Sequence, residues 1–268
     1  MPELPEVETI RRQLKKYYLG ERITEVTVYT PVLLQNITSR QLQENVRGTT
    51  LRDIRRRGKL LIFVLDTHWL VFHLGMSGIF LRHAAQSRQP RHIHLMFDLT
   101  SEKRLFYQDV RKFGKIWFYS HPVPFHHLGI EPLSKDFTLN NLKKLLHLKR
   151  MNIKRFLMEQ SIIAGIGNIY ANEILFRARI SPERMTRSLA EEEVRRLYKA
   201  VPLVLRRAVD RLGTTYRAYR TVEGESGENQ NFLNVYQQDG KPCRRCGTRI
   251  QKIVIGNRST FYCPLCQR

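Results

Sequence analysis

Cysteine is absent from the first 242 residues of this 268-residue chain, and long apolar runs are absent throughout. The longest apolar run near the start covers only Leu60–Leu65, whereas a membrane-spanning helix needs about 20 apolar residues. Glu3 and Glu6 place two acids where a signal peptide would carry positive charge. We therefore expect a soluble intracellular protein with no membrane segment.

Acidic residues are also scarce, since 24 Asp and Glu stand against 46 Lys and Arg, which gives a net charge of +22. Such a charge repels itself unless a polyanion neutralises it. With a membrane disfavoured, the expected partner is a nucleic acid. The length and the hydrophobic fraction of 42% indicate a globular protein of about two domains.

The four cysteines form two Cys-x-x-Cys pairs separated by 16 residues, namely Cys243 with Cys246 and Cys263 with Cys266. This spacing is typical of a zinc ribbon, in which four thiolates surround one structural Zn²⁺. Two disulfides or free thiols are the alternatives. Residues 251–262 between the pairs alternate like a β-hairpin, which would hold Arg258 outward.

The first half of the chain shows one helical pattern followed by strand patterns, which predicts a β-sandwich or flattened barrel with a leading helix. The helix is expected over residues 6–19, and the strands over residues 23–29, 59–65, 69–74, 92–99, 104–108 and 115–119. A tract rich in proline and glycine, residues 120–133, predicts a boundary.

Beyond that boundary the pattern becomes helical, so the fold class is α+β. Helices are expected over residues 139–148, 153–159, 169–178 and 188–212. The last helix is predicted to open with a capping box from Ser188 to Glu191 and to kink or split at Pro202. The domains expected are 1–120, a linker at 121–134, a helical domain at 135–235 and a zinc finger at 236–268.

The first six residues carry a candidate reaction centre. If Met1 is removed, Pro2 presents a secondary amine beside the carboxylate of Glu3. An α-amino group titrates near pH 8, so a useful fraction is unprotonated at neutral pH and can attack an electrophilic carbon to form an iminium. A disordered tail is the alternative.

Three further segments suggest contacts with nucleic acid. The run from Arg55 to Lys59 suits phosphate but could be a solvated face. Met76 lies between glycines, and Arg111 and Phe113 share one loop, so these side chains could wedge between bases; core packing is the alternative. The segment Gly165–Asn168 is similar to a phosphate-binding turn that leads into a helix.

Taken together, the motifs resemble those of formamidopyrimidine-DNA glycosylases, over residues 2–268. In chain order they are Pro2–Thr9, Arg56–Lys59, His73–Gly78, Asp109–Gly114, Gly165–Tyr170 and the two cysteine pairs. The resemblance implies a monomeric bifunctional DNA glycosylase and lyase of the bacterial cytoplasm, associated with the nucleoid when bound to DNA. It implies excision of oxidised purines, such as 8-oxoguanine, from double-stranded DNA, and action on abasic sites.

The resemblance also implies roles for individual residues. Pro2 would attack the sugar and form a Schiff base that leads to β- and δ-elimination; Glu3 and Lys59 would be catalytic, and Glu6 would support them. The residues implied to contact DNA are His73, Met76, His92, Arg111, Phe113, Lys154, Asn168 and Arg258. The residues implied to cap the extruded base are Tyr216, Arg217, Tyr219, Arg220, Thr221 and Val222.

A few positions depart from the pattern that this family usually shows. Ile130 stands where proline is common, Asn229 where an aromatic is common, and Ser77 where some members carry glutamate. The Ile130 difference concerns loop stiffness, the other two concern the preferred lesion, and the Schiff-base residues stay in place.

Three other functions remain open at this point. A sister glycosylase of the endonuclease VIII type would prefer oxidised pyrimidines, although its usual Pro-Glu-Gly start is Pro-Glu-Leu here. A non-catalytic protein that binds damaged DNA would bend DNA without turnover. An RNA-binding zinc ribbon is a more remote alternative, because the single-strand stacking motifs of RNA modules are not visible.

Overall fold

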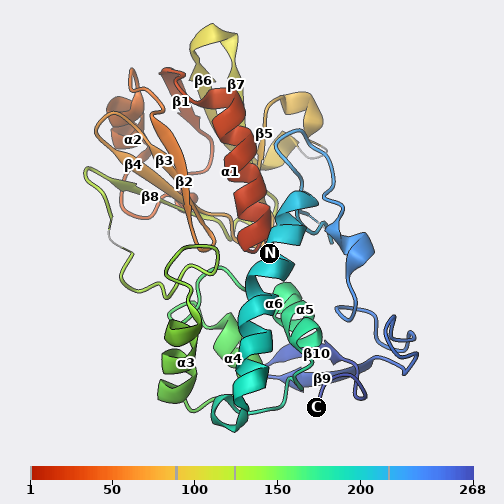
Figure 1. Cartoon of the computed structure of the whole chain (residues 1–268). Coiled ribbons are helices and arrows are strands. Elements are labelled where there is room, and N and C mark those ends of the chain that lie inside the picture. Colours follow the sequence, from red (N-terminus) through yellow and green to blue (C-terminus); the bar gives the residue numbers. More distant parts are fainter. Residues whose placement is uncertain (1, 88–89, 124, 217) are drawn as a thin grey trace. The chain divides into compact units, whose positions relative to one another are not determined.

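The computed structural model describes residues 2–87, 90–123, 125–216 and 218–268 (Figure 1). Its contacts divide the chain into two compact units. The first comprises Met1–Phe125 and Arg211–Gln230, and the second His126–Asp210 and Asn231–Arg268. Residues 211–230 therefore pack with the N-terminal unit, whereas the sequence analysis assigned them to the helical segment.

The first unit contains two antiparallel four-stranded sheets. One sheet has the order β2 (Asp53–Arg57), β3 (Leu60–Val64), β4 (Trp69–His73) and β8 (Lys115–Tyr119). The other has the order β1 (Ile23–Val28), β6 (Ile93–Leu99), β7 (Arg104–Asp109) and β5 (Gly78–Leu81). The predicted β-sandwich and all six predicted strands are confirmed.

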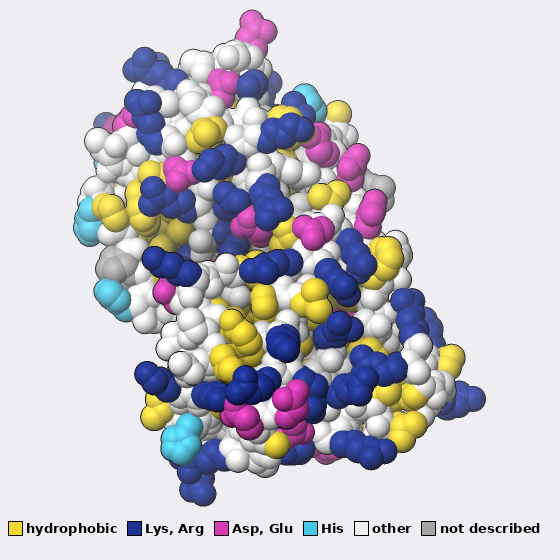
Figure 2. Space-filling model, viewed as in Figure 1, with side chains coloured by type: hydrophobic (Ala, Val, Ile, Leu, Met, Phe, Trp, Pro, Cys, Tyr) yellow, Lys and Arg dark blue, Asp and Glu magenta, His cyan; other side chains and the backbone are white. Residues whose placement is uncertain are grey.

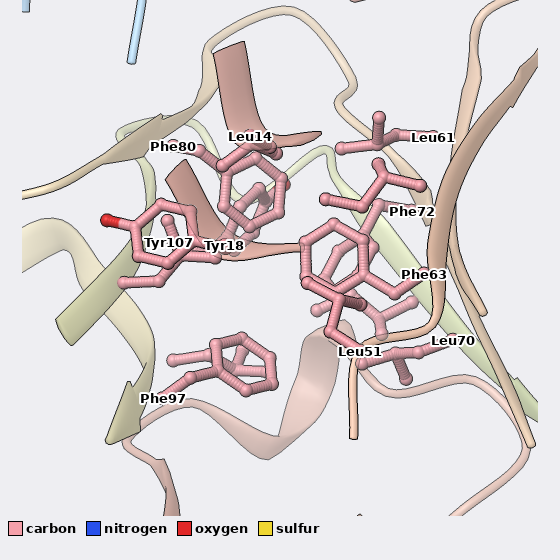
Figure 3. Close-up of a cluster of buried hydrophobic side chains, with 14 of the residues drawn as sticks. Leu14, Tyr18, Leu51, Leu61, Phe63, Leu70, Phe72, Phe80, Phe97 and Tyr107 are labelled. Carbon is pink, nitrogen blue, oxygen red and sulfur yellow. The ribbon is translucent and has the colours of Figure 1, made fainter. Parts of the chain in front are cut away.

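Aromatic side chains from both sheets fill the core between them (Figure 3). Phe63 of β3 lies 5.0 Å from Phe72 of β4, 5.6 Å from Phe80 of β5 and 6.2 Å from Phe97 of β6, measured between ring centroids. Tilted ring pairs at these distances add to the hydrophobic stabilisation that burial gives. The core therefore joins the two sheets into one sandwich.

Two strands and one α-helix described in this unit were not predicted from the sequence. They are β2, β5 and the short helix α2 (Ser39–Val46). In β2 only Ile54 is buried, and its three arginines conceal the strand pattern. Pairing with β3, not the hydrophobic pattern of β2 itself, specifies this strand.

The helix α1 (Leu4–Tyr18) begins two residues earlier than predicted. Its N-cap residue is Glu3, whose N–H donates to Oε2 of Glu6 at 2.7 Å. Val7, Ile10, Leu14 and Tyr18 pack into the sandwich core. Pro5 occupies the second position of α1, where a backbone N–H would have no acceptor within the helix. The N–H that proline lacks therefore costs the helix no hydrogen bond.

Glu8 of α1 joins this helix to β2. Its carboxylate accepts hydrogen bonds from Arg11, Arg12 and Arg56 at 2.7–3.0 Å, and the Glu8 and Arg56 side chains are only 10% and 8% exposed. Burial alone would raise the pKa of Glu8, but the hydrogen bonds and charges of Arg11 and Arg56 outweigh it and lower the pKa to about 2.

Replacing Glu8 with glutamine is expected to lower the free energy of unfolding by about 3 kcal/mol, because a buried charge partner is removed. Since the folded pKa is depressed, the stabilisation exists above pH 4.5 and is lost as the pH falls toward 2. Urea unfolding between pH 3 and 8 measures both effects. Glu44→Gln removes an exposed pair with Arg40 and should change stability by less than about 0.5 kcal/mol; equal effects of the two substitutions would contradict this prediction.

The second unit is helical and ends in a β-hairpin. Its helices are α3 (Leu139–Leu148), α4 (Ile153–Met158), α5 (Asn168–Ala178) and α6 (Glu191–Asp210), and its hairpin strands are β9 (Gln251–Ile255) and β10 (Arg258–Tyr262). The predicted helices are confirmed with small shifts of their ends. Gly256 and Asn257 both have positive φ, of 56° and 58°, as the predicted two-residue hairpin turn requires.

The start of α6 differs from the prediction. The helix begins at Glu191, and its N-terminus is capped by Glu193, which accepts a hydrogen bond from the N–H of Ala190 at 2.8 Å. The Ser188 hydroxyl instead donates to the carbonyl of Met185, so the predicted Ser188–Glu191 capping box is wrong. Pro202 lies inside α6 without splitting it.

Candidate functional site

The N-terminal residues form a buried cluster at the start of α1. Pro2, Glu3 and Glu6 are all buried, so these residues are not a disordered tail. Met1 lies outside the described residues. The two carboxylate oxygens of Glu6 have different hydrogen-bond partners. Oε2 accepts from the Glu3 N–H at 2.7 Å, and Oε1 accepts from the Thr214 N–H at 2.7 Å. Glu6 therefore ties the start of α1 to residues 213–214.

Gly213 and Tyr219 complete the surroundings of Glu6. Gly213 has φ of +77°, and a Cβ at this position would lie 2.9 Å from Cγ of Glu6, so glycine is required there. The Tyr219 hydroxyl donates to the carbonyl of Leu212 at 3.0 Å. Burial, and next the charge of Glu6, raises the pKa of Tyr219, which keeps its hydroxyl protonated as a donor.

Lys59 lies in the two-residue turn between β2 and β3 and is half-buried. Arg56 supports this turn, because it donates to the carbonyl of Gly58 at 3.1 Å and to Glu8 at 3.0 Å. A hydrogen-bonded chain thus runs from α1 to the turn that carries Lys59. The nearby His73 has a lowered pKa, first through burial and then through the charge of Lys59, and its Nδ1 accepts from the Gly75 N–H at 3.2 Å.

Met76, Arg111 and Phe113 form an exposed cluster that two loops bring together. The guanidinium of Arg111 lies 4.5 Å from the ring centroid of Phe113 and donates to the sulfur of Met76 at 3.2 Å. Met76 is 41% exposed and Phe113 is 51% exposed, so ordinary core packing does not explain them. We call these three residues the wedge cluster.

The buried carboxylate of Asp109 holds the two loops of the wedge cluster in place. Its Oδ1 accepts from the Ser77 hydroxyl at 2.5 Å and from the Arg111 N–H at 3.2 Å, and its Oδ2 accepts from the Gly114 N–H at 2.7 Å. The carbonyl of Asp109 accepts from Nε2 of His94 at 2.7 Å. Sequence reasoning missed this role, although Asp109 begins one of the quoted motifs.

Asp109→Asn is expected to weaken binding to lesion-containing duplex DNA by about tenfold, because an amide offers one acceptor oxygen where the carboxylate offers two. Fluorescence anisotropy with a lesion duplex measures the change. Asp98→Asn removes a half-buried carboxylate that pairs with Arg104 on the neighbouring strand and serves as the matched control. If the Asp109 variant bound the lesion duplex with unchanged affinity, Asp109 would not be needed to position the wedge cluster.

His92 is half-buried and is the last residue of the 3-10 helix Pro90–His92, directly before β6. Its ring lies 6.4 Å from that of His94, between centroids, and its Nε2 accepts from Nε of Arg91 at 3.3 Å. Because His94 contacts Asp109, the structure brings His92 into the neighbourhood of the Asp109–Gly114 loop.

Asn168 is the first residue of α5 and follows two turns that begin after α4. The amide of Gln160 organises these turns: its Nε2 donates to the carbonyls of Met158 and Ile166, and its Oε1 accepts from the Gly165 N–H. The predicted turn leading into a helix N-terminus is confirmed. Asn168 Nδ2 donates to the carbonyl of Ser259 at 3.0 Å, and its buried Oδ1 has no hydrogen-bond partner among the described residues.

Arg258 begins β10 directly after the Gly256–Asn257 turn and is exposed. Together with Asn168 it lines a cavity of about 460 Å³ on the second unit. Lys154, which we expected to contact DNA, is instead fully buried. Its ammonium donates to the carbonyl of Ser259 at 3.1 Å and to the Thr260 hydroxyl at 2.6 Å, so it fixes the strand that carries Arg258.

Glu173 is a second buried residue that sequence reasoning missed. Its carboxylate accepts from the backbone N–H groups of Asn234, Val235 and Tyr236 at 2.9–3.0 Å. These bonds fasten the segment before the zinc finger to α5. The sequence feature that could have indicated this role is the position of Glu173, a charged residue directly before the apolar stretch Ile174–Phe176 of α5.

The four cysteines come together as predicted. Their sulfur atoms all lie within 4.8 Å of one another, and the pairs Cys246–Cys263 and Cys243–Cys266 are 3.4 Å and 4.0 Å apart. A tetrahedral Zn²⁺ with Zn–S bonds of 2.3 Å requires sulfur atoms about 3.8 Å apart. All four cysteines are free thiols, so the site fits one structural zinc and the disulfide alternative is wrong.

The expected capping residues lie in the first unit, in different environments. Tyr216 is 47% exposed, Arg220 is half-buried, and Tyr219, Thr221 and Val222 are buried. Arg217 lies outside the described residues. Asn229, the departure noted in the sequence, donates to the Thr214 hydroxyl at 2.9 Å and so supports this loop internally.

Lys and Arg side chains cover much of the face shown in Figure 2, with Asp and Glu in smaller patches among them. This distribution is typical of a nucleic-acid-binding protein. Among the described residues, no helix combines the length and the apolar character that a membrane crossing needs.

Comparison with known proteins agrees with this geometry. Models of the formamidopyrimidine-DNA glycosylase N-terminal domain, of its H2TH domain, and of the zinc finger found in FPG and IleRS match residues 1–116, 128–220 and 240–268. The formamidopyrimidine-DNA glycosylase of Pelotomaculum thermopropionicum is 41% identical and covers 100% of this chain and 99% of its own length.

Solved structures give the same result. Lactococcus lactis Fpg in complex with abasic-site DNA has a TM-score of 0.91 at 36% identity, with 99% of each chain covered. MutM in complex with DNA containing carbocyclic 8-oxo-G also has a TM-score of 0.91 at 36% identity, with 100% of each chain covered. The chain belongs to the formamidopyrimidine-DNA glycosylase family.

Proposed function

We propose that this protein excises oxidised purines from duplex DNA and then cleaves the strand, with the amine of Pro2 as nucleophile. The observation that carries the proposal is the buried Pro2–Glu3 pair at the start of α1, which Glu6 holds in place. The family relationship and the structural similarity to lesion-DNA complexes support it.

The reaction begins when the Pro2 amine, exposed by removal of Met1, attacks C1′ of the damaged nucleotide. The C1′–N bond to the base breaks, and a proton supplied from the site leaves with the base. The C1′–O4′ bond then breaks as O4′ takes a proton, which opens the sugar and leaves an iminium between Pro2 and C1′. The iminium makes the C2′ proton acidic, and loss of that proton breaks the C3′–O3′ bond, so the 3′ phosphate leaves. A second elimination breaks the 5′ C–O bond. Glu3 transfers protons to the opening sugar, and Lys59 contacts the lesion and its phosphate.

A base must leave the stack before Pro2 can reach its sugar. The wedge cluster fills the space that the base vacates, with Arg111 facing the orphaned cytosine. Asn168 and Arg258 bind phosphates, and His73 and His92 add contacts on the first unit. Lys154 acts through Ser259 and Thr260 and positions Arg258.

The residues 216–222 cap the extruded base. In this role Tyr216 supplies exposed surface, whereas the buried Tyr219, Thr221 and Val222 hold the segment in shape. A zinc ion bound by the four cysteines would cross-link the finger. It would have no free coordination position for a substrate or water, so its role would be structural. The protein acts in the cytoplasm, where it associates with the nucleoid through DNA.

Borohydride trapping tests the proposal, because borohydride reduces an iminium to a stable amine. Purified protein is incubated with duplexes carrying 8-oxoguanine opposite cytosine, thymine glycol, or no damage. A covalent complex on the 8-oxoguanine duplex is expected. Trapping only on thymine glycol would assign the sister specificity for pyrimidines, and no trapping by a protein that lacks Met1 and holds zinc would indicate a binding protein without catalysis.

The phosphate contact of Arg258 has its own test. Arg258→Ala should reduce the slope of log affinity against log salt by about 1, because one fewer phosphate is neutralised. Binding titrations between 50 and 300 mM salt give the slope. Arg40→Ala removes an exposed cation of α2 that pairs with Glu44 and should leave the slope unchanged. A normal slope for the Arg258 variant would exclude the contact.

A further inference from the structure

We call residues 214–224, which include the proposed capping residues, the capping segment; this segment is fastened to α1 at two places. Glu6 accepts from the N–H of Thr214, and Gln13 accepts from the N–H of Val222 at 2.8 Å. Glu6 and Gln13 are seven residues apart, which places them about 10 Å apart along the helix axis. The helix that begins beside Pro2 thus also supports both ends of residues 214–222.

An ion pair fastens the same segment to the end of β5. Arg82 Nη1 lies 3.2 Å from Oε2 of Glu223, and its guanidinium stacks 3.9 Å over the ring of Tyr17. Gln86 adds a hydrogen bond from Nε2 to the carbonyl of Glu223 at 2.7 Å. A hydrogen bond from Tyr17, and then the charge of Arg82, lowers the pKa of Glu223, so this carboxylate stays ionised at neutral pH.

These contacts lie beside a cavity of about 330 Å³ in the first unit. The capping segment contributes one side of its lining through Ala218, Arg220 and Gly224, and the sheet contributes Ile79, Leu81 and Gln108. A Cβ added to Gly224 would approach Cβ of Gln86 at 3.3 Å, so the two sides already lie close together there. The distance between the sides therefore depends on the contacts of Gln13, Arg82 and Gln86.

We propose that Gln13 and Arg82 are positioning residues that hold the capping segment as one wall of this cavity, and that they thereby determine how well a damaged base is retained for excision. This inference rests on the proposed function. Neither residue needs to touch the base, because each acts through the backbone or side chain of residues 222–223.

The proposal separates the two activities of the enzyme. A damaged base that is still attached to its sugar contacts this wall of the cavity. An abasic site carries no base, so its cleavage does not depend on the wall. Loss of the positioning contacts should therefore slow base excision and spare cleavage at a preformed abasic site. General damage to the fold would slow both.

The test uses the double variant Gln13→Leu with Arg82→Met in the full-length, zinc-loaded protein. One hydrogen bond and one partly exposed ion pair together should lower the single-turnover rate on 8-oxoguanine by about tenfold. Cleavage of a preformed abasic duplex should stay within about twofold. Arg82→Lys should be less harmful than Arg82→Met but should not restore the full rate, since lysine keeps the charge beside Glu223 and loses the stacking on Tyr17.

Arg104→Met is the matched control, because Arg104 is an exposed arginine of the same unit that pairs with Asp98 across β6 and β7. It should leave both rates unchanged. Equal losses of excision and abasic cleavage, or no loss in the double variant, would overturn the proposal. Failure of the proposed function itself would appear separately, as absence of borohydride trapping by the unsubstituted protein on abasic DNA.

Discussion

Pro2→Gly is expected to lower excision of 8-oxoguanine by about 100-fold or more while lesion-DNA affinity changes by less than about threefold. Glycine retains an amine, but it is primary and lacks the ring that fixes its direction, and misplacing a reacting atom by about 1 Å can cost about 100-fold. Single-turnover excision and borohydride trapping measure the chemical step. Anisotropy measures affinity separately.

A matched control comes from Pro31, which begins the short 3-10 helix Pro31–Leu33 in the same unit. Pro31→Gly changes the same residue type away from the cluster of Glu3 and Glu6 and should leave trapping unchanged. If Pro2→Gly trapped as efficiently as the unsubstituted protein, the nucleophile would have to be another amine, and Lys59 would be the next residue to replace.

Cys246→Ser is expected to weaken binding to lesion DNA by roughly 100-fold, because a structural zinc site that loses one thiolate no longer holds its domain folded. The sulfur cluster packs with Phe176, Val235 and Phe261, so losing the metal should disorder the hairpin that carries Arg258. Metal analysis and binding titrations on the same preparation connect zinc content to affinity.

Histidine at this position provides the control, since imidazole is also a zinc ligand and Cys246 is exposed. Cys246→His should keep one zinc per chain and most of the affinity. Normal affinity in a zinc-free Cys246→Ser protein would show that the finger is not needed for DNA binding.

Patterns within single segments predicted most of the fold. Alternation identified six strands, helical periodicity identified α1 and α3–α6, and Gly256–Asn257 identified the hairpin turn. The strand β2 was missed because its pairing with β3 specifies it. The start of α6 was misplaced because the Ser188 hydroxyl bonds to the Met185 carbonyl, while Glu193 accepts from the Ala190 N–H.

The sequence also indicated which residues would gather, but not how each would be used. Met76, Arg111 and Phe113 meet in one exposed cluster. Lys154, for which the resemblance implied a DNA contact, is a buried support for β10. The roles of Asp109 and Glu173 could not be predicted, because a sequence does not reveal which donors will face a buried carboxylate. Asp109 accepts from the Gly114 N–H of its own loop and from the Ser77 hydroxyl of another loop, and Glu173 accepts from N–H groups of the segment before the zinc finger.

The attachment of α1 to the capping segment has a consequence for how this enzyme tolerates mutation and engineering. The proposed nucleophile Pro2 and the N-cap residue Glu3 directly precede α1, and α1 carries the two anchor points of the capping segment, at Glu6 and Gln13. An insertion between residues 6 and 13 would rotate and displace one anchor relative to the other. Residues 6–13 therefore form a spacer of fixed length, and designed insertions or deletions belong elsewhere in the chain.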